Sequence, residues 1–168
     1  MPETAILLTS RASVRLQVSA RALPAAAATA IRGAPLPQQP NTWTGDDPTI
    51  SWVAPDAWLL QSASQDGDKL TAATRAACAS LPCAVTDLSD ALVTITLEGP
   101  QASAVLARGC GLDLRAGSFG VQACARTRLA QLPVLIRKSA SARFELVVDR
   151  AAAKYLQDWL VDAAAGFE

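Results

Sequence analysis

Residues 91–109 read ALVTITLEGPQASAVLARG and describe a strand followed directly by a helix. The apolar side chains of Val93, Ile95 and Leu97 recur at every second position, the period that is typical of a half-buried strand. A Gly-Pro pair then closes the strand, and the alanine-rich remainder has the composition of a helix. This stretch therefore predicts a mixed α and β fold.

The same order of elements occurs earlier in the chain. Residues 13–20 also alternate, and Pro24 opens an alanine-rich stretch that Gly33 is well placed to end as a helix. A shift of 76 positions lays Pro24 on Pro100 and Arg32-Gly33 on Arg108-Gly109. The shift indicates an internal duplication of a strand-helix-strand-strand-helix unit, although shared propensities alone could produce two such segments.

We therefore predict an α+β fold of duplicated β-α-β-β-α units with antiparallel sheets. Residues 1–168 would form one domain with two repeated lobes, at about 10–82 and 83–168. The other expected elements are a loop over 34–48, a hairpin of strands 49–54 and 58–61, a helix over 69–80, a loop over 112–120, a strand-rich stretch over 126–137 interrupted at Pro133, a strand over 144–148 and a helix over 150–164.

Composition and charge exclude several classes of protein. The chain is 51% hydrophobic and 18% charged, which is a globular composition, and its 15 basic residues balance 15 acidic ones. This balance argues against a nucleic-acid partner. No apolar run reaches the length of a membrane span, so we expect a cytoplasmic protein without a membrane partner. Residues 10–32 carry arginines and no acid, which also suits a transit peptide, but a strand and a helix account for them.

Histidine is absent, which removes histidine-based triads, metal ligands and acid/base groups. The four cysteines do not form a C-x-x-C motif or close pairs typical of zinc sites, and they are Cys78, Cys83, Cys110 and Cys124. We expect them to be small buried apolar side chains. An oxidised pair of Cys78 and Cys83 is the alternative.

The acidic residues and glycines offer no convincing catalytic or cofactor site. The acids lie in turn-like surroundings where aspartate caps backbone groups; they are Asp46, Asp47, Asp66, Asp68, Asp87, Asp90 and Asp113. Residues 108–111 contain a G-x-G without the further glycine of a dinucleotide site or the Lys-Ser/Thr of a phosphate loop. We therefore predict no catalytic, cofactor-binding or metal-binding residue in this chain.

Three tryptophans lie around the expected hairpin. Trp52 and Trp58 are expected to fill a core that has few other large side chains, with a role in a protein interface as the alternative. For Trp43, in the loop, the two interpretations are equally supported.

Several ordered stretches resemble one family. These are Leu36-Pro37, Pro40-Asn41-Thr42, residues 52–60 (WVAPDAWLL), Thr86-Asp87-Leu88-Ser89, Leu97-Glu98-Gly99-Pro100, residues 108–114 (RGCGLDL), residues 124–130 (CARTRLA) and residues 155–160 (YLQDWL). Together they are similar to the sarcosine oxidase gamma subunit family, which shares its D-x-S and G-P segment with the aminomethyltransferase folate-binding fold. Ala54 and Ala57 depart from the glycine and glutamate that the family often has in the hairpin.

The resemblance implies a non-catalytic small subunit of a heterotetrameric sarcosine oxidase. Its partners would be the alpha, beta and delta subunits, and FAD, FMN, NAD and tetrahydrofolate would be bound by those partners. The complex would convert sarcosine to glycine, methylenetetrahydrofolate and hydrogen peroxide.

Two alternatives come from other classes. One is a stand-alone folate-binding one-carbon protein, in which Asp87 or Glu145 would hold the pterin. The other is the corresponding subunit of a related N-methyl amino acid dehydrogenase. In a sarcosine oxidase or in the related dehydrogenase, substrate choice would be made by a different chain. An exposed apolar contact face is expected if the chain packs on a larger partner.

Overall fold

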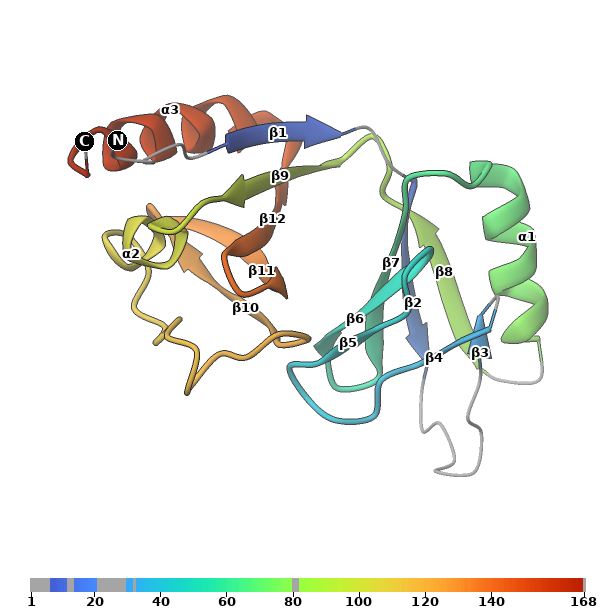
Figure 1. The fold of residues 1–168 in the computed structure, drawn as a ribbon. Helices are drawn as coiled ribbons and strands as arrows, with labels where there is room; N and C mark the ends of the chain where they lie inside the picture. Colours follow the sequence, from blue (N-terminus) through green and yellow to red (C-terminus); the bar gives the residue numbers. More distant parts are fainter. Residues whose placement is uncertain (1–6, 12–13, 21–29, 32, 80–81, 168) are drawn as a thin grey trace. The chain divides into compact units, whose positions relative to one another are not determined.

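The computed structural model describes residues 7–11, 14–20, 30–31, 33–79 and 82–167. The chain forms two compact units, drawn in Figure 1: an N-terminal unit, Ala12–Asp90, and a C-terminal unit, Ala91–Glu168 together with Met1–Arg11. Each unit contains a five-stranded sheet whose neighbouring strands are all antiparallel. The predicted α+β class with antiparallel sheets is confirmed.

The elements of the N-terminal unit are β2 (Val14–Ala20), β3 (Ala30–Ile31), β4 (Ala34–Pro35), β5 (Trp43–Thr44), β6 (Thr49–Ala54), β7 (Ala57–Ser62), α1 (Gly67–Ala77) and β8 (Cys83–Asp87). Its five-stranded sheet has the strand order β5-β6-β7-β2-β8, and β3 and β4 pair separately. The predicted hairpin of β6 and β7 is confirmed, with Asp56 at a positive φ of 56° in its turn.

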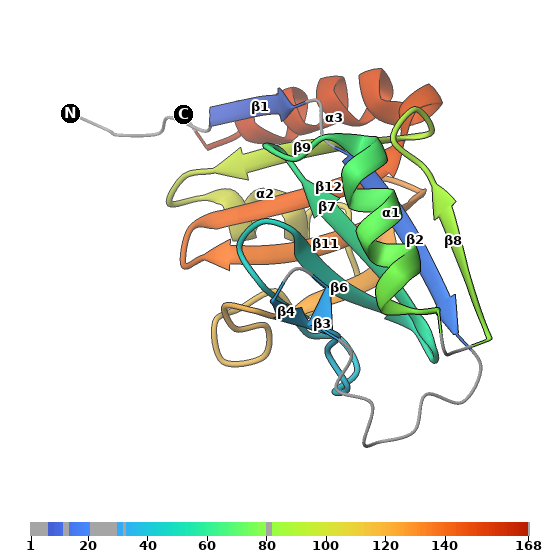
Figure 2. The same cartoon turned by 90° about the vertical axis from the view of Figure 1, so that its right-hand side faces the viewer.

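Helix α1 covers the sheet of the N-terminal unit, as Figure 2 shows. Asp66 begins the helix because its side chain accepts a hydrogen bond from the Lys69 backbone N–H at 3.1 Å. Leu70 of α1 belongs to the apolar core of this unit. The other buried residues of the core come from β2, β6, β7 and the β3–β4 hairpin, and from the residues that follow β4 and α1: Leu16, Val18, Ile31, Ala34, Leu36, Ile50, Trp58, Leu60 and Cys78.

The elements of the C-terminal unit are β1 (Leu7–Arg11), β9 (Leu92–Glu98), α2 (Ala102–Ala107), β10 (Cys124–Leu129), β11 (Leu132–Ala140), β12 (Arg143–Asp149), the short 3-10 helix η1 (Arg150–Ala152) and α3 (Ala153–Ala165). Its sheet has the strand order β1-β9-β12-β11-β10. The predicted strand-helix pair over 91–109 therefore appears as β9 and α2.

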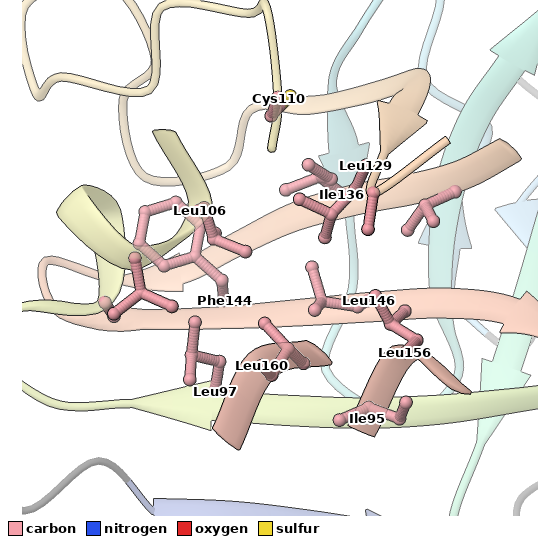
Figure 3. Close-up of a cluster of buried hydrophobic side chains, with 14 of the residues drawn as sticks. Ile95, Leu97, Leu106, Cys110, Leu129, Ile136, Phe144, Leu146, Leu156 and Leu160 are labelled. Atoms are coloured by element: carbon pink, nitrogen blue, oxygen red, sulfur yellow. The ribbon is translucent and has the colours of Figure 1, made fainter. Parts of the chain in front are cut away.

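One face of this sheet carries the apolar core of the C-terminal unit. Figure 3 shows side chains from the sheet, α2 and α3 converging, among them Ile95, Leu97, Leu106, Ile136, Phe144, Leu146, Leu156 and Leu160. Helix α3 contributes its residues at a helical spacing, as predicted. Tyr155, expected on the same face, lies at its edge and is 53% exposed.

The predicted helix from Pro24 to Gly33 is wrong at its end. Ala30 and Ile31 form β3, which pairs with β4, and Gly33 lies in the turn between them at a φ of +85°. A glycine at positive φ suits a helix end and a tight strand turn equally, so its residue type could not distinguish them. Residues 21–29 and 32 lie outside the described part of the chain.

Other segments also differ from the expected ones: the loop expected over 34–48 contains the short strands β4 and β5, which pair with β3 and β6. The 126–137 stretch turns at Ala130-Gln131, both at positive φ, whereas Pro133 lies within β11. Proline is tolerated there because the pairing of β11 with β12 begins only at Leu135. Strand β8 pairs with β2 and belongs to the N-terminal unit, which extends to Asp90; the two repeated lobes stay a prediction.

Candidate functional site

Three of the candidate acidic residues, Asp66, Asp87 and Asp113, accept hydrogen bonds from residues that follow them closely in the chain. In the N-terminal unit, Asp87 Oδ1 accepts hydrogen bonds from the Ser89 backbone N–H at 2.8 Å and from its hydroxyl at 2.6 Å. In the C-terminal unit, the Asp113 carboxylate accepts bonds from the Arg115 guanidinium at 2.7 and 2.8 Å and from the Ser118 hydroxyl at 2.8 Å. Asp66, as described above, caps α1. These contacts are the capping geometry that the sequence predicts.

Hydrogen bonding lowers the pKa of three aspartates, Asp87, Asp113 and Asp47, away from the range of a general acid. The side-chain hydrogen bond from Ser89 lowers the pKa of Asp87, and the bond from Arg115 lowers the pKa of Asp113. For Asp47, partial burial raises the pKa, but hydrogen bonds from serine side chains and backbone groups outweigh it and the pKa is lowered. A general acid needs the opposite shift, because it must hold its proton at working pH.

Glu145, the second candidate for holding a pterin, is engaged by a neighbouring strand. It forms an ion pair with Arg137 of β11, and only 18% and 5% of the two side chains are exposed. Removing one partner of a buried ion pair destabilises a protein strongly, because the charge of the other partner is no longer compensated. The carboxylate of Glu145 is therefore occupied by the protein itself.

The G-x-G stretch has a packing role. A Cβ on Gly109 would lie 2.5 Å from Cζ2 of the Trp159 indole, so glycine lets the end of α2 approach α3. The neighbouring Arg108 donates to the Ala163 carbonyl at 2.7 Å, and its guanidinium lies 4.3 Å from the centre of the Phe167 ring. Arg108 and Gly109 thus hold the C-terminal helix, a role that the sequence motif did not indicate.

The tryptophans of the hairpin take core positions. Trp58 is 3% exposed, and its indole Nε1 donates to the Pro37 carbonyl at 2.8 Å. Trp52 is half-buried and packs on the same cluster, which agrees with the core interpretation of both residues. Trp43 is half-buried in the short strand β5.

Sequence reasoning missed a buried lysine. Lys138 is 2% exposed, its ammonium donates to the Phe119 carbonyl at 2.9 Å, and it lies 5.2 Å from the centre of the Phe144 ring. It anchors the loop before β10 to β11. The alternation of the strand could not reveal this burial, because the covering residues come from a loop distant in sequence.

In the described ranges, no group of three or more histidine, cysteine, aspartate or glutamate side chains could hold a metal ion. The four cysteines all lie in the described ranges, and none of them forms a disulfide; Cys78, Cys110 and Cys124 are buried as expected, whereas Cys83 is partly exposed. Of the helices that the structure describes, none has the length and apolar character needed to cross a lipid bilayer.

The two antiparallel sheets with their helices define the class of the protein. The structure aligns with the glycine cleavage system aminomethyltransferase T of Bartonella henselae, with a TM-score of 0.65 and 19% identity, over 92% of this chain and 45% of that one. This likeness shows the fold that the sequence led us to expect. The chain is an α+β protein of the aminomethyltransferase-like fold.

Closer relatives define the family. The structure aligns with a chain of the heterotetrameric sarcosine oxidase from Corynebacterium sp. U-96, with a TM-score of 0.90 and 29% identity, over 99% of this chain and 87% of that one. The sarcosine oxidase subunit gamma of Corynebacterium sp. (strain P-1) is 33% identical over 158 residues, 90% of this chain and 76% of that protein. A model described as "Sarcosine oxidase, gamma subunit family" matches residues 17–166. The chain belongs to the sarcosine oxidase gamma subunit family, which confirms the resemblance.

Proposed function

We propose that the chain is the non-catalytic gamma subunit of a heterotetrameric sarcosine oxidase and supports assembly of the subunits that carry the chemistry. The TM-score of 0.90 with a chain of such a heterotetramer, over 99% of the residues, is the observation that carries this proposal. The partners would be alpha, beta and delta subunits, in the cytoplasm.

The local chemistry supports a role in packing. The carboxylates of Asp66, Asp87, Asp113 and Glu145 are each engaged by neighbouring backbone or side-chain groups. As the family resemblance implies, FAD, FMN, NAD and tetrahydrofolate would be bound by the partner subunits, and the complex would oxidise sarcosine to glycine, transfer the one-carbon unit to tetrahydrofolate and release hydrogen peroxide.

The test is purification of the tagged chain from its native host, followed by a gel, a visible spectrum and an assay of peroxide formation on sarcosine. We expect two large chains and one small chain to co-elute with a flavin spectrum and with sarcosine-dependent peroxide. A matched preparation carrying the tag on an unrelated host protein controls for flavoproteins that bind the resin.

Other results would redirect or refute the proposal. A flavin complex that is inactive on sarcosine but active on another N-methyl amino acid would indicate the related dehydrogenase. If the chain elutes alone and colourless, the subunit proposal fails, and titration with tetrahydrofolate tests the stand-alone alternative.

A further inference from the structure

Two cysteines of the N-terminal unit lie in contact where α1 meets β8. Cys78 follows the last residue of α1 as its C-cap, and Cys83 is the first residue of β8. The Cys83 Sγ donates a hydrogen bond to the Cys78 carbonyl oxygen at 3.5 Å. Figure 1 shows α1 and β8 side by side. The packing of helix on strand thus brings the Cys83 thiol to the backbone of Cys78.

The two thiols differ in their access to solvent. Cys78 is 1% exposed and belongs to the apolar core of the unit. Cys83 is partly exposed and borders a surface hollow of about 560 Å³, together with residues that include Ser19, Asp56 and Ala84. A small oxidant in solution can therefore reach Cys83, whereas Cys78 is shielded.

We propose that Cys78 and Cys83 are a peroxide-oxidised dithiol, in which Cys83 reacts first and Cys78 then closes an intrachain disulfide. The Cys83 thiolate attacks one oxygen of hydrogen peroxide, the O–O bond breaks, and Cys83 becomes a sulfenic acid while hydroxide leaves and takes up a proton. The Cys78 sulfur then attacks the Cys83 sulfur, the S–O bond breaks, and a second water leaves. Two thiols are oxidised and one peroxide is reduced to two waters.

Electrostatics supports this order of events. Burial, then the like charge of the Cys83 thiolate and the hydrogen bond to Cys83, raise the pKa of Cys78 to about 11. Cys78 therefore keeps its proton near neutral pH, and because the thiolate is the reactive form, Cys78 is the less reactive thiol of the pair. The sulfenic acid formed on Cys83 is uncharged, so no like charge then opposes the attack by Cys78.

The physiological source of the oxidant rests on the proposed function, since a sarcosine oxidase releases hydrogen peroxide beside its own subunits. The chemistry itself needs only added peroxide, so its test is independent of the partners. In a reducing compartment such a disulfide would be transient.

The experiment treats the full chain, with whatever subunits co-purify, with hydrogen peroxide, and then alkylates it in denaturant for thiol counting and peptide mass spectrometry. We expect this chain to fall from four alkylated thiols to two, with the peptides of Cys78 and Cys83 joined by a disulfide. Dithiothreitol should restore all four. Cys110 and Cys124, both buried, are internal controls that stay reduced.

Single variants separate the two roles. Cys78→Ser should leave a Cys83 sulfenic acid that dimedone traps, and Cys83→Ser should leave Cys78 unmodified at the same peroxide dose. The proposal is overturned if all four thiols survive peroxide, if the joined peptides lie in two different chains, or if Cys110 and Cys124 oxidise as fast as Cys83. Dimedone labelling of Cys78 in the Cys83→Ser chain would overturn the order of the steps.

Discussion

Substitution of Gly109 by alanine should destabilise the contact between the end of α2 and helix α3. The added Cβ would lie 2.5 Å from Cζ2 and 2.6 Å from Cη2 of Trp159, and 3.2 Å from the backbone nitrogen of Ala130. Carbon atoms pack best at about 3.5–4.0 Å, so the indole must retreat by about 1 Å.

Two opposing effects determine how much Gly109→Ala changes the free energy of unfolding. Overpacking of a well-packed site costs about 1–3 kcal/mol. Alanine also restricts the unfolded chain, which recovers about 0.4–1 kcal/mol where the native φ permits it. We therefore expect Gly109→Ala to lower the free energy of unfolding by about 1–2 kcal/mol, and each kcal/mol lowers Tm by about 2–4 °C in a chain of this size.

Urea and thermal denaturation of the purified chain, followed by tryptophan fluorescence and circular dichroism, measure this loss. Gly111→Ala is the matched control, because no atom lies within 4 Å of a Cβ at Gly111. It should be neutral or slightly stabilising. Trp159→Phe removes the part of the ring that clashes, so Gly109→Ala should cost less in that background, with a coupling of about 0.5 kcal/mol or more. Equal stability of the Gly109→Ala and Gly111→Ala chains would refute the packing role of Gly109.

Three further predictions use the same denaturation assays. Glu145→Gln should destabilise the chain by about 3 kcal/mol because it removes the carboxylate that compensates the buried Arg137 charge, and replacing both residues by leucine should recover much of that loss. A fully additive double variant would contradict the pairing. Asp66→Ala should cost about 1 kcal/mol because it removes the α1 cap, whereas the nearby control Asp68→Ala should cost less. The pKa of Asp113 is lowered on folding, mainly by its hydrogen bond with Arg115, so its contribution to stability is present above its unfolded pKa and is lost as pH falls through the lower folded value. Asp113→Asn should therefore lose less stability than the parent between about pH 4 and pH 2, and parallel pH profiles would contradict this.

The hydrophobic pattern of a segment predicted its secondary structure correctly where that segment alone decides its conformation. The alternation of residues 14–20 and 92–98 predicts β2 and β9, and the turn at Pro55-Asp56 predicts the hairpin of β6 and β7. The two hairpins β6–β7 and β10–β11 begin 75 positions apart, close to the shift seen in the sequence. The duplication itself stays a prediction.

Local pattern failed where the partner of a segment decides its conformation. Ala30 and Ile31 have neighbours of helical composition, but Ile31 is fully buried in the core cluster with Leu70 of α1, and pairing with Ala34-Pro35 makes it a strand. Propensity is a weak prior that such tertiary contacts override.

The sequence alone determined the fold class and the capping roles of the aspartates, because these follow from spacing and from side chains that act on their own backbone. It also pointed to the family, through the resemblance of its ordered motifs to those of known members. Tertiary structure alone decided that Lys138 is buried under the Phe119 loop, that Gly109 admits Trp159, and that the Cys83 thiol reaches the Cys78 carbonyl. Each of these depends on which segments pack together. Burial and contact between separate elements are properties of packing, and no local period encodes them.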